Sequence, residues 1–281
     1  MAKLQLRLQR TIDNQLGLDP GLERLARLYG TSEELTKYLI KTINKGIFSE
    51  IEIWMTDLCM EEEAESRCDD LINQSLLMDQ ENPEALSMLA SIKVSQQRPD
   101  DAREALVKSW ELFDARKLNL EDEANRENSE AVEVQQEYLE LYEPLLTVAK
   151  LSIELELYET AILAASGAQD INELSVEAYY YEGLAALLHG RRLHALSHGL
   201  EEYRELSIAS SDNEEAQQFL NDARIALTHG YKALQSDEEV DPEVAEQVNV
   251  LLSPLGGPLM SELMRGRNEE ELEGWEEEIE E

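Results

Sequence analysis

The sequence has few of the residues that break helices, build sheets or form covalent frameworks. Its 281 residues include only 13 Gly, 7 Pro and 2 Cys, and aromatic residues make up 6%. Two cysteines are too few for a disulfide scaffold and fit a reducing compartment. Segments in which Val, Ile and Thr alternate with polar residues are missing, so the sequence predicts no sheet. Ala, Leu, Glu and Gln are abundant instead, and because these side chains lose little freedom in helices, we expect an all-α protein.

Positive charge and long apolar runs are also scarce. The formal net charge is −37, and it is uneven: residues 1–50 hold 8 Lys/Arg and 6 Asp/Glu, whereas residues 51–281 hold 16 and 55. Such acidity argues against direct binding of nucleic acid and favours a cationic partner bound in a salt-sensitive way, although it could also serve only to keep the protein dispersed. No apolar run approaches the roughly 20 residues needed to cross a bilayer, so we expect no membrane association.

The start of the chain, MAKLQLRLQR, is basic and amphipathic. It lacks the continuous apolar segment of a secretory signal. A mitochondrial presequence is the alternative, against which Asp13 and Asp19 count. We therefore expect a cytoplasmic and nuclear protein.

The chain repeats a helical-hairpin pattern of 34 residues. The segment PEALSMLASIKVSQQRPDDAREALVKSWEL begins at Pro83 and follows the tetratricopeptide (TPR) pattern. It places Leu86, Leu89 and Ala90 on the packing positions of a first helix, and Ala102, Leu106 and Ser109 on those of a second. The same register predicts repeats that begin near residues 49, 83, 142 and 176, and it places Ala195 on the second helix of the last one.

Five segments make up the predicted organisation. Residues 1–46 form a divergent helical segment, and residues 47–235 a TPR-like solenoid. Within the solenoid, we expect an acidic insertion at 113–137, as a surface loop followed by the beginning of a helix. A capping helix at 212–234, with Asp212 as its N-cap, should close the repeats. Residues 236–281 are expected to be an acidic, largely flexible tail with a possible helix at 242–252.

The cysteines and histidines do not form a recognised catalytic or metal motif. The repeat register puts Cys59 on a first helix and Cys68 on a second, both at contact positions, so we interpret them as small buried side chains. His194 and His198 are four residues apart in HALSH, without the glutamate of the HExxH motif. We expect no enzyme, no cofactor and no metal. A metal-dependent hydrolase that uses these two histidines is the least favoured hypothesis.

The first helix of each repeat in a TPR superhelix lines its inner, concave surface, and position two of that helix is glutamate in every repeat. The predicted partner-binding residues on this surface are Glu50, Glu84, Glu143 and Glu177 at position two, with Ile53, Asp57, Glu61, Ser87, Ser91, Glu154 and Tyr180 at other inner positions. Lys150 is the exception in sign. An extended Lys/Arg-rich segment would find carboxylates on successive repeats and Tyr180 for stacking. Glutamate also suits the first turn of any helix, and this second explanation remains open.

Three runs, MTDLCMEEEAESRC, ALSMLASIKVSQQR and YYYEGLAALLHG, resemble the tetratricopeptide-containing assembly chaperones of large-subunit ribosomal protein four. The resemblance covers about residues 47–235. It implies a chaperone that binds the newly made basic ribosomal protein through its extended loop, as a monomer bound one-to-one, and supports assembly of the large ribosomal subunit. Residues 1–46 do not continue the repeats that the family has on this side. A general TPR scaffold in another protein complex is the alternative function.

Overall fold

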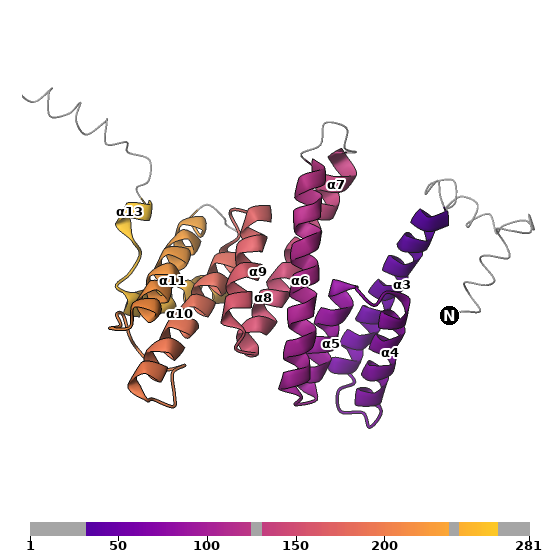
Figure 1. Ribbon diagram of the computed structural model, residues 1–281, viewed down its shortest axis with the longest axis horizontal. Coiled ribbons are helices and arrows are strands. Elements are labelled where there is room, and N and C mark those ends of the chain that lie inside the picture. The colour runs from indigo at the N-terminus through magenta and orange to yellow at the C-terminus, as the bar shows by residue number, and fades with distance from the viewer. Residues whose placement is uncertain (1–31, 125–130, 236–241, 264–281) are drawn as a thin grey trace, which may run out of the picture. The chain divides into compact units, whose positions relative to one another are not determined.

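The computed structural model describes residues 32–124, 131–235 and 242–263, in which every regular element is a helix (Figure 1). The predicted all-α class is thus confirmed. The chain divides into two compact units, Met1–Gln80 and Glu81–Glu281. In its described part, the chain has no helix of the length and apolar character that crossing a bilayer requires.

The described part of the first unit is one hairpin of α3 (Ser32–Met55) and α4 (Ala64–Met78). Ile51 on α3 and Ile72 on α4 are buried, and the Ser75 hydroxyl donates a hydrogen bond of 2.9 Å to the Asn44 side-chain oxygen. Because the buried positions of α3 extend back to Leu35, the helix begins well before the predicted repeat start near residue 49. The predicted boundary between residues 46 and 47 is therefore wrong, since it falls inside α3.

The two cysteines of this unit have different surroundings. Cys68 is buried on α4, as predicted. Cys59 is exposed in the connection between α3 and α4, so its predicted burial is wrong. The physical reason is that α3 ends at Met55, whereas the repeat register assumes a first helix that continues through Cys59.

The second unit is built from three successive hairpins. They pair α5 (Pro83–Ser95) with α6 (Pro99–Ala124), α8 (Tyr142–Glu154) with α9 (Tyr158–Ile171), and α10 (Val176–His198) with α11 (Glu214–Ala233). The first helices of the hairpins also contact one another, α5 with α8 and α8 with α10. A short α7 (Ala131–Leu139) packs on α6. Figure 1 shows these helices side by side in chain order.

The first two hairpins of the second unit have the same type of turn between their helices. Gln97 and Glu156 both adopt a left-handed backbone, with φ of 57° and 62°. In each turn the following amide reaches back to close the helix end: Arg98 N to Lys93 O at 2.9 Å, and Leu157 N to Ser152 O at 2.8 Å. Both turns follow first helices of 13 residues. The repeats predicted near 83 and 142 therefore have the same backbone form.

The last hairpin departs from this form because α10 continues without a break for 23 residues. Ala195 lies on this first helix and not on a second one, so its predicted place is wrong. The segment around Gly190 has no proline or capping side chain to stop the helix. A Cβ built on Gly190 would lie 3.0 Å from the Ala216 carbonyl oxygen, so this glycine allows α11 to approach closely.

Helix α11 is the partner of α10, so the helix predicted at 212–234 exists but belongs to the last hairpin. The Asn213 side chain, not Asp212, caps it by accepting a hydrogen bond of 3.1 Å from Ala216 N.

The predicted insertion at 113–137 is largely helical. Residues 113–124 continue α6, where Phe113 and Leu120 are buried, so the predicted surface loop is wrong over this range. Lys117 anchors the extension, with its ammonium 2.7 Å from Asp170 and 2.8 Å from Glu121. Residues 131–137 belong to α7, as the predicted start of a helix requires, and 125–130 lie outside the described residues.

The predicted tail is folded over residues 242–263. Helix α12 (Pro242–Leu252) confirms the helix predicted there, and a 3₁₀ turn, η1 (Ser253–Leu255), and the short α13 (Met260–Leu263) follow. Val248, Leu252 and Leu255 are buried against core residues of α10 and α11. The predicted flexibility is therefore wrong for this segment, because the sequence pattern did not reveal the apolar surface that α10 and α11 present. Residues 236–241 and 264–281 lie outside the described residues.

Candidate functional site

Three of the predicted glutamates lie at the same end of neighbouring helices. Glu84, Glu143 and Glu177 occupy the first turns of α5, α8 and α10. These helices run in the same direction because an antiparallel partner follows each of the first two. The starts of α8 and α10 are joined directly by the Tyr142 and Ser175 hydroxyls, 2.6 Å apart. We refer to Glu84, Glu143 and Glu177 as the glutamate row.

Local sequence fixes two of these helix starts. Asn82 caps α5 by accepting a hydrogen bond of 3.0 Å from Ala85 N, and Ser175 caps α10 by accepting one of 3.0 Å from Ala178 N. In both helices the glutamate follows two residues after the cap. A carboxylate at this place complements the positive end of the helix dipole.

The electrostatics of the row centre on tyrosines. Burial raises the pKa of Tyr142 most, and the nearby Glu177 and Glu143 carboxylates raise it further, against the lowering effect of the Ser175 hydrogen bond. Carboxylates from two adjacent helices therefore act on the pKa of the same phenol. Glu177 also accepts a hydrogen bond of 2.8 Å from the Tyr181 hydroxyl. Burial and this bond raise the pKa of Tyr181.

The row is available to a partner. Glu143 is exposed, and Glu84 and Glu177 are partly exposed. Among the residues that the structure describes, none of the three carboxylates forms an ion pair. The ring of Tyr180, half-buried, lies 5.4 Å from that of Tyr181 at an angle of 52°. Carboxylates beside aromatic faces are suited to cationic side chains.

Four of the other predicted partner-binding residues lie in the first unit. In the first unit, Glu50 and Ile53 are exposed on α3, and Asp57 and Glu61 are exposed in the connection that follows it. Lys150, the one residue of opposite sign on this surface, is exposed on α8.

Three more predicted residues lie elsewhere in the second unit. Ser87 is buried, and the partly exposed Ser91 donates a hydrogen bond of 3.4 Å to the Ser87 carbonyl. Glu154 is exposed at the last residue of α8, at the other end of that helix from Glu143.

Acidic first turns are common in this chain. They also occur on helices outside the row, at Glu65, Asp100, Asp101, Glu159, Glu214, Glu215 and Glu243. Helix-dipole complementarity therefore remains open as an explanation of each glutamate. The row joins three helices of common direction, with α8 in contact with both α5 and α10. Among the second helices, α6 and α9 contact each other in the same way, with Asp100, Asp101 and Glu159 in their first turns.

Sequence reasoning missed the polar partners of the row. Tyr142 directly precedes Glu143, Ser175 has the residue type of an N-cap, and Tyr181 follows Glu177 by one helical turn. These local signals were present. The contact between Tyr142 and Ser175, 33 residues apart, is tertiary and has no local signal.

The histidine pair lies elsewhere on α10. His194 follows Glu177 by 17 positions, or about 26 Å along the helix axis. The pair is therefore separate from the glutamate row.

Comparison with known proteins found a matching family model, similar sequences and a similar solved structure. Residues 174–274 match the family model described as the ACL4 C-terminal domain. A relative from Schizosaccharomyces pombe, named a probable assembly chaperone of rpl4, is 27% identical over 262 residues, which cover 90% of this chain and 68% of the relative. A protein of the same name from Emericella nidulans is 57% identical over 53 residues, 19% of this chain and 14% of the relative.

A solved structure of an assembly chaperone of RpL4 (Acl4) has the same kind of fold. It superposes with a TM-score of 0.50 at 24% sequence identity, over 69% of this chain and 60% of that one. The chain therefore spans less than two thirds of the length of that structure. The predicted resemblance to the assembly chaperones of large-subunit ribosomal protein four is confirmed: residues 174–274 match the ACL4 C-terminal domain model, and the two relatives and the solved structure carry the name of such a chaperone.

Proposed function

We propose that this protein is a chaperone that binds newly made large-subunit ribosomal protein four and supports assembly of the large ribosomal subunit. Its relatives carry the name of such a chaperone. The observation that carries the proposal within this chain is the glutamate row, three carboxylates without ion pairs among the described residues, on adjacent parallel helices. The client would be held by charge, without catalysis.

The spacing of the row suggests the kind of segment that it accepts. Packed helices lie about 8–10 Å apart, and an extended chain advances about 3.3–3.6 Å per residue. A strand that crosses α5, α8 and α10 would therefore meet a carboxylate at about every third residue. We infer that the client segment carries Lys or Arg at that spacing. Arginine would also stack on Tyr180.

The direct test is binding of purified large-subunit ribosomal protein four to the full chain, followed across a salt series. Between 0.1 M and 1 M salt the Debye length falls from about 10 Å to about 3 Å, so binding through exposed carboxylates should weaken strongly. Affinity that does not change with salt, or absence of a complex, would contradict the proposal.

A matched pair of variants separates the row from general acidity. The row variant carries Glu84→Gln, Glu143→Gln and Glu177→Gln. The control variant carries the same change at exposed first-turn glutamates outside the row, namely Glu65, Glu159 and Glu214. Both lose three charges and three helix-dipole contacts.

Exposed ion pairs contribute about 0.2–1 kcal/mol each, so we expect the row variant to bind roughly 3- to 150-fold more weakly and the control to bind almost normally. Equal loss in both variants would show that only net charge matters. Unchanged binding in both would favour the alternative, a general TPR scaffold whose partner docks elsewhere.

The proposal also covers the stoichiometry and the cellular location of the complex. We propose a one-to-one complex that forms in the cytoplasm and is delivered to nuclear pre-ribosomes. The net charge of −37 supports a role without direct contact to nucleic acid, because a phosphate backbone would be repelled.

A further inference from the structure

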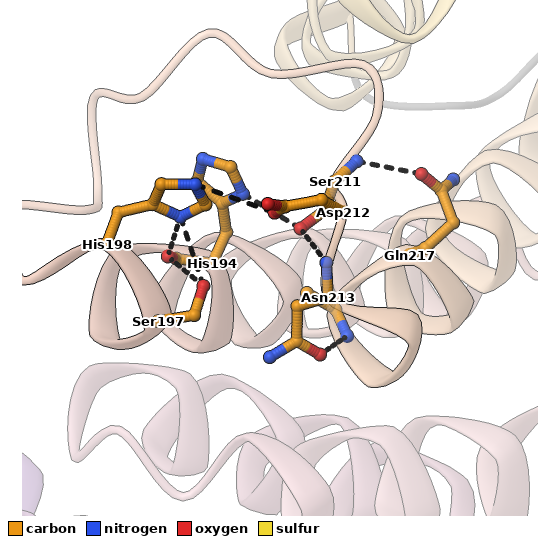
Figure 2. Close-up of polar contacts among 8 residues, drawn as sticks. His194, Ser197, His198, Ser211, Asp212, Asn213 and Gln217 are labelled. Carbon is orange, nitrogen blue, oxygen red and sulfur yellow. Dashed lines mark hydrogen bonds and ion pairs between the residues drawn. The ribbon is translucent and has the colours of Figure 1, made fainter.

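A second cluster of functional groups lies at the far end of α10. His194 and His198 are one helical turn apart near the C-terminal end of this helix, and Asp212 lies in the connection just before α11 (Figure 2). One ring nitrogen of each histidine and one carboxylate oxygen of Asp212 lie within 4.8 Å of one another. The two imidazole rings are stacked, with centroids 4.2 Å apart.

The contacts of His198 favour the tautomer that carries its hydrogen on Nδ1. This atom lies 2.9 Å from the His194 carbonyl oxygen and 3.0 Å from the Ser197 hydroxyl. Because the carbonyl only accepts and the Ser197 hydroxyl already donates to it, both contacts suit a hydrogen on Nδ1. In the neutral ring, Nε2 then presents a lone pair, and it lies 3.5 Å from the Asp212 carboxylate. Two acceptors that face each other at this distance repel unless a cation lies between them.

The second histidine is also held from outside the cluster. The Nδ1 atom of His194 lies 2.8 Å from the Ser211 hydroxyl, as Figure 2 shows. Hydrogen bonds of this kind, from a serine on one ring and a backbone carbonyl on the other, are what orients histidines as metal ligands. Each ring keeps one nitrogen free of these contacts.

We propose that His194, His198 and Asp212 bind a zinc ion, with water as the fourth ligand. Two imidazoles and one carboxylate are a ligand set that Zn²⁺ accepts in tetrahedral geometry. With metal–ligand bonds of about 2.0–2.2 Å, ligand atoms around one ion are roughly 3.3 Å apart, so the pairs of ligand atoms approach by at most about 1.5 Å on binding. The side chains of His198 and Asp212, 40% and 77% exposed, can make this movement.

The bound ion would join the end of α10 to the start of α11. Gly199 ends α10, and Asp212 directly precedes Asn213, the N-cap of α11. The metal would therefore close the connection that spans residues 199–211 at its base. Asp212 lies 14 positions after His198 and only the fold brings it near, so the sequence pattern indicated the two histidines alone.

The test is zinc titration by calorimetry of the full chain carrying Cys59→Ser, so that the exposed thiol does not bind the metal. Excess Mg²⁺ is present to occupy scattered carboxylates, because carboxylate oxygens suit Mg²⁺ whereas imidazole suits Zn²⁺. We expect one zinc ion per chain. Loss of a group that only supports a metal ligand lowers metal affinity by up to about 100-fold. Loss of a ligand itself should cost at least as much, so we expect His198→Gln and Asp212→Asn each to lower the zinc affinity by at least about 100-fold.

His229→Gln is the matched control, because this histidine lies on α11 next to Glu262 and outside the cluster. It should bind zinc as the parent does, and so should the variant of the glutamate row, which keeps this test separate from that of the proposed function. The ion should also raise the unfolding temperature of the parent and of His229→Gln, and not that of the ligand variants.

Two results would overturn the proposal. One is the absence of saturable zinc binding, which would mean that a proton on His198 alone relieves the repulsion from Asp212. The other is equal affinity in His198→Gln and His229→Gln. Because His198 and Asp212 are exposed, both ligand variants are expected to fold, and their thermal unfolding in the absence of zinc checks this.

Discussion

Replacing Gly183 with alanine tests the packing of the last hairpin. Gly183 is buried on α10 against α11, and a Cβ built there would lie 2.5 Å from Leu227 Cγ and 2.8 Å from its Cδ2. Leu227 is fully buried, and the Ala223 carbonyl lies 3.3 Å from the same point. The buried leucine cannot rotate into solvent, and the Ala223 carbonyl of α11 limits the space for the new methyl group on its other side. The methyl group therefore has to separate α10 from α11.

Two effects of opposite sign set the size of the change. Overpacking of a core costs about 1–3 kcal/mol. Alanine in a helix interior is about 0.8–1.0 kcal/mol better than glycine. Because the overlap involves a buried branch carbon, we expect the cost to prevail, with a net loss of about 1–2 kcal/mol in the free energy of unfolding. For a unit of about this size that is a drop of roughly 2–8 °C in Tm.

Gly167→Ala is the matched control for a urea unfolding series monitored by circular dichroism. Gly167 is also buried in a helix, α9, but its nearest neighbour for a Cβ is Leu145 Cδ1 at 3.6 Å, an ordinary contact. This variant should be as stable as the parent or up to about 1 kcal/mol more stable. If Gly183→Ala matched Gly167→Ala, the close packing of α10 on α11 would be refuted.

A double variant adds a second check. Leu227→Ala alone should cost about 2–5 kcal/mol, because it leaves a cavity. Combined with Gly183→Ala, it should cost less than the sum of the two, since the clashing atoms are then absent. Simple additivity of the two free energies would argue against the contact.

Three further outcomes are expected. Gln97→Gly should raise the free energy of unfolding by about 0.5–1 kcal/mol, because glycine has no Cβ to strain the left-handed backbone at this position. Gln96→Gly, at a position where φ is −79°, should lower the free energy of unfolding. Urea unfolding measures both variants. The Arg204 hydrogen bond lowers the pKa of the Glu156 carboxyl, so its contribution is present above the pKa of an unfolded glutamate and is lost as the pH falls through the lower folded pKa. Glu156→Gln should thus destabilise by less than about 1 kcal/mol near neutral pH and be neutral in acid, and a deficit that persists in acid would contradict this. Cys59 should react with a thiol reagent in the folded protein, whereas Cys68, buried and with its pKa raised by that burial, should react only on unfolding, as mass spectrometry of labelled peptides would show.

The sequence predicted the fold best where signals are local. The hairpin that begins at Pro83 has an N-cap at Asn82 and a turn near Pro99, and both helices lie where the repeat pattern places them. The same register found α8 and α9. It also placed Glu84, Glu143 and Glu177 in first turns, because each follows a helix start by a fixed number of residues.

The errors share a physical cause, which is that the partner of a residue is not visible in its own segment. Gly183 and Gly190 of α10 pack closely against α11. This contact favours a helix that continues through Gly190, where the repeat register predicted a second helix. Cys59 was assigned to a helix that ends four residues earlier, at Met55. Asp212 was interpreted as a cap, and the fold instead places it beside His198.

Helix α12 decides how the array of hairpins ends. In a stack of repeats, each hairpin leaves an apolar flank that the next copy would cover, so an unprotected last copy can recruit another molecule. Here Val248, Leu252 and Leu255 occupy that flank on α10 and α11, and Arg224 fastens the segment by donating to the Gly257 carbonyl at 2.8 Å. We therefore expect a version of the chain that is cut before Pro242 to expose this apolar surface of α10 and α11 and to associate with other molecules.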